Sequence, residues 1–201
     1  MKRTTTRILA ILCAAVLLLC SCAPIQPQNA ISPKALTKDQ QDIVDLLGAD
    51  QEIALFSYHT QEQYLRFDVW LEIYEDGELM NAHAAGLSLM ADEPKSWDGD
   101  LAMSVVQTPD FQWTFTKMQD GSRTSSTSEP IPAPGENLGR AYGPITAPAT
   151  IEDGKDIILY TSLFSSDDVL SVYAEEEYEK RPELLKEYAG AHVVKCRFSN
   201  D

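Results

Sequence analysis

The chain has 201 residues, with 16 Lys and Arg against 31 Asp and Glu and a formal net charge of −15. Nucleic-acid binding needs a basic footprint, which this acidic balance excludes. The same balance disfavours electrostatic docking on anionic lipid. We therefore expect no nucleic-acid partner, and attachment to a membrane must depend on something other than surface charge.

The first residues of the chain are typical of an export signal. Lys2, Arg3 and Arg7 precede an apolar run from Ile8 to Leu19. A membrane-spanning helix needs roughly 20 apolar residues, and this run is clearly shorter. The pattern therefore predicts a cleaved signal peptide rather than a transmembrane segment.

The segment Leu19-Cys20-Ser21-Cys22 resembles the lipobox of bacterial lipoproteins. The resemblance implies that a signal peptidase cuts after the small residue Ser21 and that Cys22 then receives lipid. It also implies a cell-membrane location on the extracytoplasmic face. Two acyl chains hold firmly, since each buried CH₂ contributes about 0.8 kcal/mol. The alternative is an ordinary cleaved signal with incidental cysteines.

Three segments follow from this interpretation: a signal peptide at residues 1–21, lipidated Cys22 with a Pro/Gln-rich tether up to residue 36, and a single β-rich domain at residues 37–201. Without the leader, 13 basic residues face 31 acidic ones, because the leader holds three basic residues and no acid. Cys196 is then the one thiol left free. No disulfide can form within the mature domain, and we expect a buried, unreactive thiol.

A short helix is expected near each end of the domain. Thr37 and Gln40 have the spacing of a capping box, and Gly48 is a typical C-terminal stop. Apolar residues recur on one side of this first helix, at Ile43, Leu46 and Leu47. The second helix is expected at Pro182–Tyr188, with proline at its first position.

Strands dominate the rest of the domain. The segment Tyr64–Glu75 alternates strictly between apolar and polar residues, which indicates a sheet with one face on the core. Asp-Gly pairs, the strongest short hairpin signal, occur at residues 76–77, 98–99, 120–121 and 153–154. The other predicted strands are Ile53–Tyr58, Leu79–Met90, Leu101–Gln107, Phe111–Met118, Asp156–Phe164 and His192–Phe198.

These elements predict a mainly β fold, an antiparallel β-sandwich with one short helix near each end. The Ser/Pro-rich segment 122–150 is long for a loop inside a compact domain. Three interpretations of it stay open: a functional loop, an irregular edge strand, or a mobile insertion.

The polar face of the Tyr64–Glu75 strand is the candidate ligand-binding surface. Tyr64, Arg66, Trp70 and Tyr74 all lie on it. Aromatic side chains on a polar sheet face can stack on a flat ligand or anchor a protein partner. The alternative is that these aromatics are covered, or that they form ordinary cross-strand pairs.

No pattern in the chain indicates a catalytic residue, a metal site or a cofactor. His59, His83 and His192 lack the close spacing of zinc ligands, and we expect His192 to be a structural residue. Residues 86–90 (GLSLM) begin like a nucleophile elbow but lack its final glycine. Phosphate-binding and dinucleotide-binding glycine patterns are missing from the sequence.

The sequence pattern of residues 37–201 does not by itself point to a particular family. We expect a non-enzymatic module that binds a protein, a glycan or another envelope component, and that has the membrane as a partner through its lipid anchor. The alternative is a hydrolase of envelope polymers whose carboxylates come from different strands. A third hypothesis is a structural role in a larger membrane complex.

Overall fold

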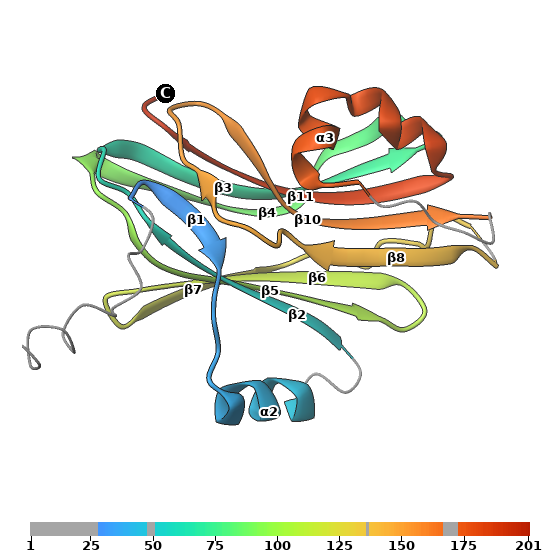
Figure 1. The fold of residues 1–201 in the computed structure, drawn as a ribbon, viewed down its shortest axis with the longest axis horizontal. Helices are drawn as coiled ribbons and strands as arrows, with labels where there is room; N and C mark the ends of the chain where they lie inside the picture. Colours follow the sequence, from blue (N-terminus) through green and yellow to red (C-terminus); the bar gives the residue numbers. More distant parts are fainter. Residues whose placement is uncertain (1–27, 48–50, 136, 167–172) are drawn as a thin grey trace, which may run out of the picture.

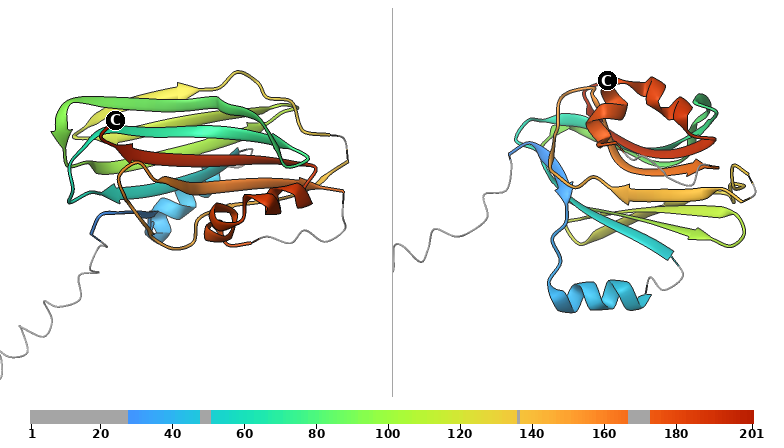
Figure 2. Two further views of the ribbon diagram at one scale, coloured as in Figure 1. Left: turned by 90° about the horizontal axis from the view of Figure 1, so that it is seen from above. Right: turned by 45° about the vertical axis from the view of Figure 1, so that its right-hand side comes forward.

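The computed structural model describes residues 28–47, 51–135, 137–166 and 173–201, which form a two-layer antiparallel β-sandwich (Figures 1 and 2). The predicted fold class is thereby confirmed. The signal peptide, Cys22 and Gly48 lie outside the described residues. Within the described part of the chain, no helix is long and apolar enough to cross a membrane.

The two layers are sheets of six and five strands within the described residues. The order of the first sheet is β7-β6-β5-β2-β1-β9, with β1 at Ala30–Pro33, β2 at Gln51–His59, β5 at Asp98–Gln107, β6 at Phe111–Gln119, β7 at Ser122–Thr127 and β9 at Ala149–Thr150. The order of the second is β4-β3-β11-β10-β8, with β3 at Tyr64–Glu75, β4 at Glu78–Lys95, β8 at Gly139–Pro144, β10 at Asp156–Ser165 and β11 at Gly190–Ser199.

Short helices lie on the outer faces of both sheets. Figure 1 shows α2 (Lys38–Leu47) outside the six-stranded sheet and α3 (Glu175–Lys180) outside the five-stranded one. A 3₁₀ helix, η1 (Pro182–Glu187), follows α3, so the two predicted helices are confirmed and α3 is an addition. The capping box of α2 is present, because the Thr37 N–H donates to Gln40 Oε1 at 3.0 Å and the Gln40 N–H to Thr37 Oγ1 at 3.3 Å.

Two residues of the predicted apolar stripe of α2 stay largely exposed. Ile43 is 57% exposed and Leu46 is 79% exposed. The capping box, rather than burial of these side chains, therefore stabilises the N-terminus of this helix.

Aromatic side chains fill the space between the sheets. Phe67 on β3 stacks on Phe198 on β11 with ring centroids 4.3 Å apart, and Tyr58 on β2 lies 5.0 Å from Phe67. Val69 and Leu71 are also buried, which confirms the predicted core face of β3. Each fully buried side chain of this size contributes about 1.5–3 kcal/mol.

Three boundaries differ from the sequence prediction. The sandwich begins at Ala30 rather than at residue 37, because β1 pairs with both β2 and β9. Asp98 and Gly99 are not a turn but open β5, where they pair with residues 59 and 58 of β2. The segment Ser122–Thr127 is an ordinary edge strand paired with β6, so part of the Ser/Pro-rich region belongs to the sheet.

Two of the predicted Asp-Gly turns are tight hairpins. Asp76 and Gly77 have φ values of 49° and 75°, and Asp120 and Gly121 have values of 50° and 75°. A type I′ turn requires positive φ at both central residues, and its twist matches that of the flanking strands. These turns connect β3 to β4 and β6 to β7.

The inner face of β11 contains two buried groups that the sequence analysis expected to be structural. Cys196 is a fully buried free thiol, and burial raises its pKa. His192 is 1% exposed and lies against the rings of Phe111, Trp113 and Phe164 at 5.1–5.8 Å. Its burial, and then the nearby positive charge of Arg140, lowers its pKa to about 4.

The lowered pKa of His192 makes stability depend on pH in a defined window. The unfolded histidine has a pKa of 6.5, so between pH 6.5 and 4 the unfolded state binds more protons. The contribution of His192 to the free energy of unfolding is fully present above pH 6.5, and it is lost as the pH falls from 6.5 to about 4. From pH 7 to pH 5 we expect the wild type to lose about 2 kcal/mol more unfolding free energy than His192→Leu. Urea denaturation at both pH values measures this difference, and equal losses would contradict it.

Candidate functional site

A cavity of about 600 Å³ opens on the outer face of the five-stranded sheet. Its volume falls within the range of about 300–1,000 Å³ that is typical of small-molecule sites. Side chains from four strands line it: Arg66, Asp68, Trp70 and Glu72 on β3, His83 and Ser88 on β4, Asp156 on β10, and Arg197 on β11. We take this cavity as the candidate functional site.

Strand register explains how residues so far apart in the sequence meet here. On β3, Asp68 lies opposite Arg197 of β11 and Ser88 of β4. Asp156 of β10 in turn lies opposite Arg197. Directly opposite residues in antiparallel strands share a face of the sheet, so these polar side chains form one continuous surface.

Trp70 forms the floor of the cavity. It is only 6% exposed, and the Arg197 guanidinium lies over its ring, 5.3 Å from the centroid. The neighbouring residue on β4 is Gly86, where a Cβ atom would lie 2.6 Å from the Val69 carbonyl oxygen. The absence of a side chain at Gly86 therefore allows β4 to approach β3 closely beside the indole.

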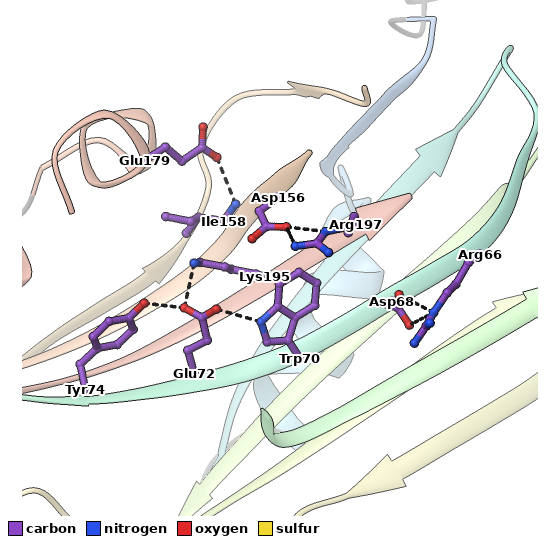
Figure 3. Close-up of polar contacts among 10 residues, drawn as sticks. All are labelled: Arg66, Asp68, Trp70, Glu72, Tyr74, Asp156, Ile158, Glu179, Lys195 and Arg197. Carbon is purple, nitrogen blue, oxygen red and sulfur yellow. Dashed lines mark hydrogen bonds and ion pairs between the residues drawn. The ribbon is translucent and has the colours of Figure 1, made fainter. Parts of the chain in front are cut away.

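The Glu72 carboxylate is held by three donors, which Figure 3 shows converging from two strands. It accepts hydrogen bonds from Trp70 Nε1 at 3.0 Å and Tyr74 Oη at 2.6 Å, and Lys195 Nζ lies 2.8 Å away. Burial by itself raises the pKa of Glu72, but the bonds from Lys195, Tyr74 and Trp70 outweigh it and lower the pKa overall. Glu72 is therefore ionised at neutral pH, although its residue is only 7% exposed.

Two arginines present hydrogen-bond donors to the cavity. Arg66 Nε lies 2.7 Å from Asp68 Oδ2, and Arg197 donates from Nε to Asp156 Oδ1 at 2.6 Å. Within the described residues, no protein partner is found for Nη1 and Nη2 of Arg66 or for Nη1 of Arg197. Both side chains are about two-fifths exposed. Their remaining N–H groups are therefore available to a ligand.

A second cavity of about 670 Å³ adjoins the first and shares Gly154, Asp156 and Arg197 with it. Its walls include Tyr178 of α3 and Leu185 of η1. The two cavities together form a groove, which we call the outer groove.

The wall of the outer groove is fixed by apolar packing and one polar contact. Buried side chains of the helical segment pack on Ile158 of β10 and Val193 of β11; they are Tyr178, Leu184, Leu185 and Tyr188. The Glu179 carboxylate accepts a hydrogen bond from the Ile158 N–H at 3.4 Å (Figure 3). That N–H lies where the pairing of β10 with β11 shifts register, between Ile158 and Tyr160.

The structure brings together only some of the predicted site residues. Arg66 and Trp70 line the first cavity, and Tyr74 lines the second. Tyr64 does not belong to the site, because it is fully buried, with its ring 5.8 Å from that of Phe198. The pairing of β3 with β4 shifts register between Tyr64 and Arg66, so Tyr64 lies outside the regular stretch of that pairing.

The alternative that these aromatics are covered therefore holds for Tyr64 and Trp70. Trp70 lies beneath charged side chains and does not present an open ring to solvent. Asp156 and Arg197 were not among the predicted site residues, although they line the first cavity. The signal for Arg197 was its outward position in the alternating strand His192–Phe198, but nothing in that pattern indicates that β11 lies beside β3.

Carboxylates and cations alternate across the first cavity. Asp68 pairs with Arg66, Asp156 with Arg197, and Glu72 with Lys195. Among the described residues, no group of three or more His, Cys, Asp or Glu could hold a metal ion. The arrangement offers hydrogen-bond donors and acceptors side by side, which suits binding of a polar, hydroxyl-rich ligand.

A family model described as the YgaN domain matches residues 30–198. The matched range begins with β1 and ends in β11, so it covers the sandwich and the outer groove. No curated protein and no solved structure matches the chain.

Proposed function

The chain belongs to the YgaN domain family, and we propose that it is a lipoprotein that works as a non-enzymatic binding module. In this proposal Cys22 carries lipid and holds the domain at the extracytoplasmic face of the cell membrane. The outer groove takes the ligand, which we propose to be a glycan of the cell envelope.

The anchor is supported by the leader and by the start of the sandwich. The basic residues, the short apolar run and the lipobox-like segment 19–22 precede a Pro/Gln-rich stretch. Because Asn29 already bonds to Ile151 and β1 begins at Ala30, the tether in this proposal is no longer than residues 23–28. At about 3.1 Å per residue, an extended tether of that length spans roughly 20 Å, which keeps the groove close to the membrane.

The observation that carries the binding role is the cavity above Trp70. Its guanidinium N–H groups can donate to hydroxyl oxygens, and the adjacent Asp68 and Asp156 carboxylates can accept from hydroxyl groups. A saccharide presents many hydroxyls that act as both donors and acceptors.

Hydrolysis of an envelope polymer is the alternative function. A glycosidase needs a carboxyl with a raised pKa as its general acid. Glu72 does not have the raised pKa of a general acid, because Lys195 and two further donors lower its pKa. Of the other carboxylates that line the cavity, Asp68 and Asp156 are each paired with an arginine, and Asp201 is exposed to solvent. The site chemistry therefore favours binding without turnover.

Arg66→Gln tests the binding site without removing its floor. Hydrogen bonds from charged groups are worth about 1.5–3 kcal/mol, so we expect the affinity for solubilised envelope polysaccharide to fall by about tenfold or more. Calorimetric titration of the full chain measures it, with Arg123→Gln on the exposed face of β7 as the matched control. Equal affinities for the two variants would refute this site, and release of shorter saccharides would favour the hydrolase.

Cys22→Ser tests the anchor. Because the chain's acidity disfavours docking on anionic lipid, we expect loss of the lipid to release the protein from membranes. Fractionation of cells into membrane and soluble protein, followed by immunoblotting, measures the release. Cys20→Ser is the control and should stay with the membranes. Full membrane retention of Cys22→Ser would contradict lipidation at that residue.

A further inference from the structure

β4 presents an unpaired edge of the five-stranded sheet. It is the terminal strand of that sheet and pairs only with β3. No residue of β4 is buried. Among the described residues, its backbone groups that face away from β3 have no backbone partner. Such an edge is a template for pairing with another strand.

The other sheet edges carry features that discourage pairing, whereas the middle of β4 does not. β9 has only two residues, β8 ends at Pro144, and β7 is a short polar strand that contains Arg123. In β4, residues 82–91 include no proline, and their one ionisable residue is His83. Proteins usually protect a long edge with charges, proline or bulges. Here the register shifts lie only outside the regular pairing of residues 85–90 with β3.

Exposed apolar side chains also lie on this strand. Met90 is 67% exposed and closes the regular stretch of residues 85–90, whereas Leu79 and Met80, 49% and 58% exposed, lie near the other end of the strand. The free backbone edge and the exposed Met90 side chain therefore indicate one docking surface.

We propose that this surface binds a second copy of the chain, with β4 pairing antiparallel to β4 of its partner so that two five-stranded sheets become one. A twofold axis perpendicular to the sheet at Ser88 generates this contact. Such a dimer needs only one self-complementary patch, which is why twofold dimers are the commonest oligomers.

Charge complementarity favours a second copy despite the net charge of −15. Antiparallel pairing about Ser88 places Asp92 and Glu93 of one copy opposite Ala84 and His83 of the other. Neither of these two residues is an acid. Met90 meets Gly86, which leaves room for its side chain. The acidic ends of the two strands therefore avoid each other.

The dimer has a consequence for the outer groove. Gly86 and Ser88 of β4 line the first cavity, so a contact at β4 brings the cavities of two copies onto one face across the axis. Two linked sites bind a repeating polymer more tightly than one site does. The dimer itself does not depend on which ligand the groove takes.

Single-cysteine cross-linking of the full chain in intact cells tests the proposal. A residue at the twofold axis meets its own copy, so Ser88→Cys should shift under mild oxidation to a disulfide-linked species of twice the monomer mass. Met118→Cys, on an exposed methionine of the other sheet, and the wild type are the controls and should stay monomeric.

Adding Met90→Lys to Ser88→Cys should abolish the doubled species, because the lysine places an unpaired charge in the strand contact. Three results would overturn the proposal. The first is cross-linking of Ser88→Cys that is no stronger than that of Met118→Cys, and the second is retention of the doubled species when Met90→Lys is added. The third is a cross-linked species of another mass, which would assign the edge to a different protein.

Discussion

The outer face of the five-stranded sheet depends on one buried negative charge. An ionised carboxylate is costly to bury unless it is paired and hydrogen-bonded. Glu72 meets this requirement through Trp70, Tyr74 and Lys195. The same three contacts orient the indole as a floor and connect β3 to β11. The positions of the three donors around the Glu72 carboxylate therefore determine the shape of the cavity.

Partial coverage of that face creates the groove. The α3–η1 segment covers one part of the sheet through an apolar cluster that includes Ile158 and Val193. The part that includes Arg66 and Arg197 stays open and polar. Binding residues thus lie on strands whose opposite faces form the aromatic core, which holds them rigidly. The edge strand β4 borders the same open region, so the proposed ligand site and the proposed dimer contact lie next to each other.

Local sequence patterns predicted the sandwich well, because alternation and turn chemistry act over a few residues. The bounds of Tyr64–Glu75, the Asp76-Gly77 hairpin and the Thr37 cap all follow from such patterns. Burial of Tyr64 could not be predicted, since Tyr64 lies outside the regular stretch of the pairing of β3 with β4. Asp156 and Arg197 were missed for a related reason: a period of two shows which face a residue occupies but not which strand lies beside it.

Glu72→Gln tests the central claim most directly, because glutamine keeps the shape of the side chain but removes the charge that attracts Lys195. We expect the sandwich to stay folded by circular dichroism, while the affinity for envelope polysaccharide falls as Trp70 and Lys195 lose their fixed positions. Glu152→Gln, at an exposed ion pair, should bind like the wild type. An unchanged affinity in folded Glu72→Gln would show that this charge does not organise the binding site.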